Sequence, residues 1–101
     1  MQNKKKIDTL TPCALIQASK KTGKVSKVLY TRCGFAMLQL WALQNTPKTK
    51  ECYICTQDGL LLSRYEGNAA GLPKVTWYED NESIEDIIPG AVAVFKENIT
   101  N

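Results

Sequence analysis

Two cysteines separated by two residues, Cys52 and Cys55, are the first side chains here whose type and spacing could do chemistry. The CxxC spacing occurs in zinc sites and in redox-active dithiols, and both need a turn that brings the thiols together. The intervening Tyr53 and Ile54 favour an extended strand, in which positions three apart point to opposite faces. We therefore predict buried, inert thiols with no metal and no cofactor. A small Cys-type zinc-binding protein, with Cys52 and Cys55 as ligands, stays as an alternative.

The other two cysteines, Cys13 and Cys33, flank a predicted hairpin. A hairpin symmetric about Gly23 would place them opposite each other on neighbouring strands, within bonding distance. A shift of one residue in the register removes that match. Whether the two are adjacent therefore stays open, and in a reducing cytosol we expect free thiols.

The chain contains no histidine, which removes the common nucleophilic triads and the usual general base at neutral pH. The glycine-bracketed segment 67–71 superficially resembles a phosphate-binding loop. It lacks the Lys-Ser/Thr pair and the following helix that such a loop requires. No catalytic constellation is visible, so we favour a non-enzymatic binding protein, although an enzyme is not excluded.

Charge is divided unevenly along the chain. Residues 1–50 hold ten of the 13 Lys and Arg residues and one acid, whereas residues 51–101 hold three basic and nine acidic residues. Such asymmetry indicates either an electrostatic partner or two halves that neutralise each other.

The first hypothesis is a polyanionic partner, either nucleic acid or a nucleoprotein. The candidate contacts lie on the predicted first hairpin, with Lys48 and Lys50 nearby. In residues 1–50 lysine outnumbers arginine nine to one, which favours loose attraction to phosphates over bidentate reading of bases. The predicted binding residues are Lys20, Lys21, Lys24, Lys27 and Arg32.

The alternative is a protein–protein interaction module or an inhibitor that uses a cluster of carboxylates. Acidic residues at the start of a helix are also explained by the helix dipole alone. The cluster consists of Glu79, Asp80, Glu82, Glu85 and Asp86.

Hydrophobic periodicity and turn residues place these side chains on eight elements. We expect a mixed α+β fold, with a mainly antiparallel sheet of about five or six strands and one buried helix packed on one face. Asp58 and Gly59 predict a type I′ hairpin turn. The predicted elements, in the order ββαβββαβ, are strands 13–18 and 25–30, helix 35–45, strands 51–57, 60–66 and 74–79, a short helix within 80–88 and strand 91–96.

The length of 101 residues fits one domain, which we place at residues 10–101 behind a flexible, basic N-terminal segment, residues 1–9. No apolar run reaches the length of a signal peptide core or a membrane span. We therefore expect a cytoplasmic protein with no membrane partner.

Overall fold

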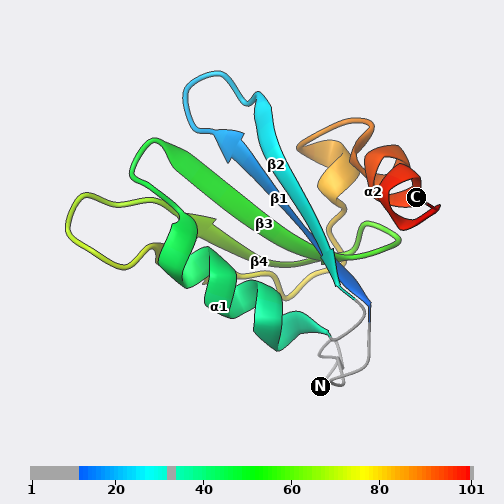
Figure 1. Ribbon diagram of the computed structural model, residues 1–101, viewed down its shortest axis with the longest axis horizontal. Helices are drawn as coiled ribbons and strands as arrows, with labels where there is room; N and C mark the ends of the chain where they lie inside the picture. The colour runs from blue at the N-terminus through cyan, green and yellow to red at the C-terminus, as the bar shows by residue number, and fades with distance from the viewer. Residues whose placement is uncertain (1–11, 32–33, 101) are drawn as a thin grey trace.

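A five-stranded antiparallel sheet is covered by a helix on each face in the computed structural model, which describes residues 12–31 and 34–100 (Figure 1). The strand order is β2-β1-β3-β4-β5. The predicted α+β class and antiparallel sheet are thus confirmed, while residues 1–9, Arg32 and Cys33 lie outside the described residues. The elements are β1 (Cys13–Ser19), β2 (Val25–Thr31), α1 (Phe35–Asn45), β3 (Lys50–Thr56), β4 (Leu61–Glu66), β5 (Lys74–Trp77), the 3₁₀ helix η1 (Ile84–Asp86) and α2 (Ala91–Thr100).

Two hydrophobic cores lie on opposite faces of this sheet, because successive strand residues point to opposite sides. On one face, Leu38 and Ala42 of α1 pack against Leu15 and Ile54. On the other face, the buried side chains are Ala14, Ile16, Tyr53, Cys55, Leu61, Ile84, Ala91 and Phe95. The interior strand β1 therefore contributes to both cores and is buried along most of its length.

The predicted helix over residues 35–45 is present as α1 and packs on one face of the sheet, as expected, but only part of its surface is buried. Its buried residues are Leu38 and Ala42, one turn apart on the face toward the sheet. Met37 and Leu40 are 60% and 54% exposed. One sheet can cover only one side of a helix, and no described element covers the outer side of α1.

The expected strand 91–96 is also wrong, because this segment forms the helix α2. Its apolar run fits the helical period as well as the strand period. Ala91 and Phe95, one helical turn apart, are fully buried, whereas Ala93 between them is exposed. A strand would have placed Ala93 on the same face as Ala91 and Phe95. Burial against η1 and the second sheet face therefore selects the helix.

The β3–β4 hairpin is confirmed, but its turn is not type I′. That type needs a positive φ at both central residues, and no described residue except glycine has one. The Gly59 N–H donates to the Thr56 carbonyl at 2.9 Å, and Gly59 has φ +99°. The arrangement is a type I turn followed by a glycine in the left-handed region, the usual solution for a slightly longer hairpin loop.

The first hairpin is present with a different register from the symmetric one. Cys13 lies opposite Thr31, and the register shifts between Gln17 and Ala18. Cys13 therefore pairs with Thr31 and not in the register symmetric about Gly23, while Cys33 lies outside the described residues.

The short acidic segment is held by its own side chains. Ser83 accepts a hydrogen bond from the Glu85 N–H, which begins η1. The Glu85 carboxylate then accepts from the N–H groups of Gly90 and Val92 at 2.8 and 2.7 Å, at the start of α2. The hydrogen bonds from Val92 and Gly90 lower the pKa of Glu85 below its ordinary value. Glu85 is therefore a capping residue for α2.

This cap predicts an acid-dependent stability. The pKa of Glu85 is lower in the folded than in the unfolded chain, so its contribution is present above the ordinary carboxyl pKa and is lost as the pH falls through the folded value. We expect Glu85→Gln to lower the thermal midpoint at neutral pH, and the difference from the parent to shrink as the pH falls below the ordinary carboxyl pKa. Asp86→Asn, which removes the same charge from an exposed neighbour, is the control in the same thermal melts. Equal effects of both variants would contradict the capping role.

Candidate anion-binding site

Lysines from several segments meet at one end of the sheet. Ser19 at the end of β1 lies opposite Lys50 at the start of β3. Glu66 at the end of β4 pairs with β3 on one side and with Lys74, at the start of β5, on the other. The turn between β1 and β2 and the loop before β3 extend from this same end. We call it the basic end and define it by Lys20, Lys21, Lys24, Lys48, Lys50 and Lys74.

Hydrogen bonds hold the connecting segments of this end together. The Lys20 N–H donates to the Thr49 carbonyl at 3.0 Å, and the Gly67 N–H donates to the Lys50 carbonyl at 2.9 Å. The Lys20 ammonium donates to the Gly67 carbonyl at 2.8 Å. The hairpin turn, the loop before β3 and the loop after β4 are therefore fixed relative to one another.

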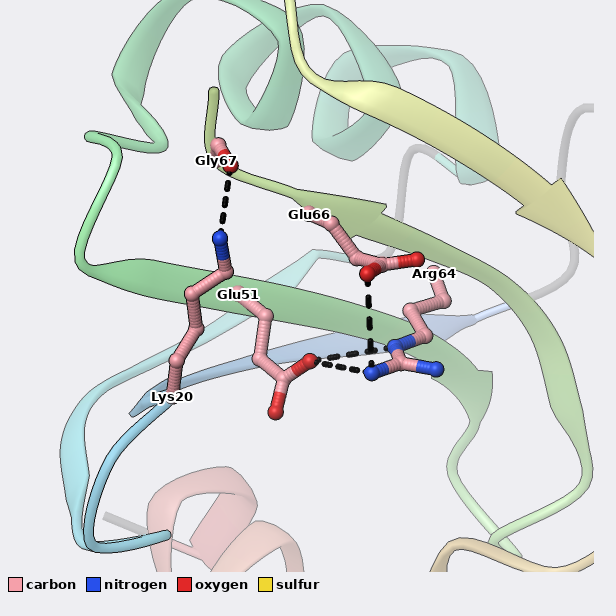
Figure 2. A network of polar contacts seen from close by, with 5 residues as sticks. All are labelled: Lys20, Glu51, Arg64, Glu66 and Gly67. Carbon is pink, nitrogen blue, oxygen red and sulfur yellow. Dashed lines mark hydrogen bonds and ion pairs between the residues drawn. The ribbon is translucent and has the colours of Figure 1, made fainter. Parts of the chain in front are cut away.

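Two carboxylates near the basic end, those of Glu51 and Glu66, both form ion pairs with one arginine, Arg64. The guanidinium of Arg64 donates to Glu51 at 2.7 and 3.0 Å and forms a longer ion pair with Glu66 at 3.9 Å (Figure 2). Figure 2 shows both carboxylates directed at Arg64, while Lys20 extends to the carbonyl of Gly67. The guanidinium also lies 5.7 Å from the ring centroid of Tyr53.

The electrostatics of Arg64 agree with this arrangement. Burial alone would lower the pKa of Arg64, but the hydrogen bond to Glu51 and the charges around the guanidinium raise it. Within residues 12–31 and 34–100, no carboxylate forms an ion pair with a lysine of the basic end. These lysines are therefore not neutralised by direct ion pairs within that part of the chain, and Glu66, the carboxylate that shares this end, is directed at Arg64.

A hollow of about 350 Å³ opens between the connecting segments of the basic end. Lys20, Lys48 and Lys74 line it, together with Glu66 and residues 67–69. The volume is at the lower end of the range for pockets that bind small molecules or single chemical groups. The hollow is thus lined by three lysines, one glutamate and the loop after β4.

The structure brings together only part of the predicted basic set. Lys20, Lys21 and Lys24 lie together in the hairpin turn, as expected. Lys27 lies further along β2, with its ammonium 6.0 Å from the ring centroid of Trp41 in α1, so it belongs to the face that α1 covers. Arg32 lies outside the described residues.

Sequence reasoning missed the contribution of Lys74 and of residues 67–69. Lys74 is 50 positions or more from Lys20, Lys21 and Lys24 in the chain, and only the pairing of β5 with β4 brings it to the same end. No local pattern in the sequence carries this signal, because an antiparallel register is a property of the assembled sheet.

The acidic segment begins at the other end of the sheet. The Leu61 N–H donates to the Glu82 carbonyl and the Ile84 N–H donates to the Gly59 carbonyl, both at 2.8 Å. These contacts place residues 82–84 beside the turn between β3 and β4. Of the predicted acidic set, Glu85 serves as the cap of α2, and the other four residues, Glu79, Asp80, Glu82 and Asp86, are exposed.

The CxxC cysteines lie on opposite faces of the sheet, as their spacing predicts. Cys52 belongs to the core under α1, and Cys55 belongs to the core under α2. Burial raises the pKa of Cys13 to about 11 and also raises the pKa of Cys52 and Cys55. The thiols of Cys52 and Cys55 therefore do not converge on one ion, and the described part of the chain holds no group of three potential metal ligands.

No helix within the described residues is long and apolar enough to cross a membrane. No protein-family model matches the chain, and neither a curated protein nor a solved structure is similar to it.

Proposed function

We propose that this protein is a non-enzymatic binding protein that engages the phosphates of a nucleic acid, free or within a nucleoprotein, through its basic end. The observation that carries the proposal is a cluster of lysines that form no ion pair with a carboxylate of the described residues, beside Glu51 and Glu66, which both pair with Arg64. Lysines that form no ion pair with a carboxylate attract a polyanion more strongly than paired ones, because no internal ion pair has to be broken first.

The residue types indicate attraction to the backbone rather than recognition of bases. All six charged groups of the basic end are lysines, which act as point charges, whereas bidentate recognition of guanine is performed mainly by arginine. The exposed aromatic Trp77 lies toward the other end of the sheet, where its backbone pairs with Ser63 and its ring packs beside Phe35. We therefore expect weak dependence of affinity on base sequence and strong dependence on salt.

The competing proposal, a protein contact through the acidic segment, has less support. Glu85 is occupied by two backbone hydrogen bonds and has a structural role. Acids at the start of a helix are stabilised by its dipole without any partner.

The test is the salt dependence of binding to a labelled oligonucleotide, followed by fluorescence anisotropy. Each phosphate contact contributes about 0.9 to the slope of log K against log salt for duplex DNA, and about 0.7 for a single strand. We expect the double variant Lys21→Glu, Lys24→Glu to reduce that slope by roughly two contacts and the affinity by about tenfold or more.

The control is the double variant Lys27→Glu, Lys96→Glu, which makes the same change in net charge away from the basic end. We expect it to bind with nearly the parent affinity. Affinity that is independent of salt, or an equal loss in both double variants, would contradict binding through the basic end.

A further inference from the structure

The hollow at the basic end differs from the rest of that surface in being a preformed site. Its rim is fixed by hydrogen bonds from Lys20 to Gly67 and from Gly67 to Lys50. The Asn68 side-chain oxygen accepts from the Ala70 N–H at 2.7 Å, which fixes the turn of the loop that lines the hollow. A ligand group entering the hollow would therefore not have to order these segments, and preorganisation of this kind lowers the cost of binding.

The charge of the hollow suits a doubly charged anion. Three lysines, Lys20, Lys48 and Lys74, line the hollow together with one acidic residue, Glu66, whose carboxylate pairs with Arg64. A phosphate monoester carries a charge of about −1.5 to −2 at pH 7. A phosphodiester within a strand carries one negative charge and leaves part of the positive charge unmatched.

The size of the hollow agrees with this class of ligand. About 350 Å³ accommodates a phosphoryl group with part of its sugar, but not a section of duplex, whose backbone would instead lie across the outward Lys21 and Lys24. The hollow and the hairpin lysines thus offer two kinds of contact to the same strand.

We infer that the hollow binds the terminal phosphate monoester of a nucleic-acid strand, with Lys20, Lys48 and Lys74 as its cationic ligands. This inference rests on the proposed function, since the adjoining lysines would hold the body of the strand. The protein would then prefer strand ends that carry a phosphate over ends that carry a hydroxyl.

The experiment compares single-stranded oligonucleotides of one sequence that carry a 5′-phosphate, a 3′-phosphate or hydroxyl groups at both ends. We expect at least one phosphorylated form to bind about tenfold more tightly than the hydroxyl form. The double variant Lys48→Gln, Lys74→Gln should lose this preference. The control Lys21→Gln, Lys24→Gln removes the same charge from the hairpin turn and should weaken all three oligonucleotides while keeping the preference.

The outcomes separate this inference from the proposed function. Equal affinity for all three oligonucleotides, with binding that still falls steeply with salt, would overturn the terminal-phosphate site and leave the proposed function standing. Binding of none of them at low salt would overturn the proposed function itself. Titration with inorganic phosphate tests the other possible ligand, a free anion. If phosphate binds at Lys48 and Lys74 but phosphorylated ends bind no more tightly than hydroxyl ends, the site serves a free anion and the inference is wrong.

Discussion

Replacing Gly67 with alanine is expected to lower the free energy of unfolding by about 3 kcal/mol or more. Gly67 is buried, and a Cβ there would overlap the carbonyl group of Pro47 and lie 2.8 Å from the Lys50 carbonyl oxygen. Both neighbours are backbone atoms, which cannot move aside without breaking the hydrogen bond that Gly67 donates to Lys50. The loop before β3 and the loop after β4 would have to separate.

Urea unfolding followed by circular dichroism measures this effect. Ala69→Ser, which adds one atom at an exposed position of the same loop, is the control and should change the stability by less than about 0.5 kcal/mol. Because Gly67 also accepts the hydrogen bond from Lys20, folded Gly67→Ala should bind oligonucleotides less tightly than the parent protein. An unfolding midpoint equal to that of the parent would contradict the close approach of these two loops.

Replacing Phe95 with alanine is the second substitution with a large expected effect, a loss of about 3–5 kcal/mol. The Phe95 ring is fully buried against the second face of the sheet, in the same core as Ile16 and Ile84. Removing it leaves a cavity between α2 and the sheet, which the surrounding side chains can fill only in part.

Ala93→Lys separates the helix from the strand that the sequence alone suggests. In α2, Ala93 is exposed and lies on a different side from Phe95, so a lysine there should be tolerated within about 0.5 kcal/mol. In a strand over residues 91–96, the same lysine would point into the core beside Phe95. A loss from Ala93→Lys as large as that from Phe95→Ala, in the same unfolding series, would contradict α2.

The charged end of the molecule was only partly predictable. Lys20, Lys21 and Lys24 could be grouped from the sequence because they lie within a single turn. Lys74 could not, since its position depends on the pairing of β5 with β4, far along the chain. The pairing of Arg64 with both Glu51 and Glu66 was equally unpredictable. The charge of each residue can be read from the sequence, but only the positions of the residues in the fold decide which lysines form no ion pair.

Local chemistry determined much of the fold by itself. Glycine at the turns, proline after α1 and the runs of β-branched and aromatic residues were sufficient to place five strands and α1. The opposite directions of Cys52 and Cys55 followed from the period of a strand, since that period depends only on backbone geometry.

The tertiary structure decided what local patterns leave ambiguous. The apolar run of residues 91–96 fits both the helical and the strand period, and burial of Ala91 and Phe95 on the second sheet face, together with the Glu85 cap, selects the helix. The same cause assigns the chemistry of this chain. The sequence by itself determined that two cysteines point apart, that histidine is absent and that lysine is in excess. The antiparallel register gathered lysines from distant segments around one hollow. Only the tertiary structure could decide this, because the pairing of distant strands is the step that brings their ends together.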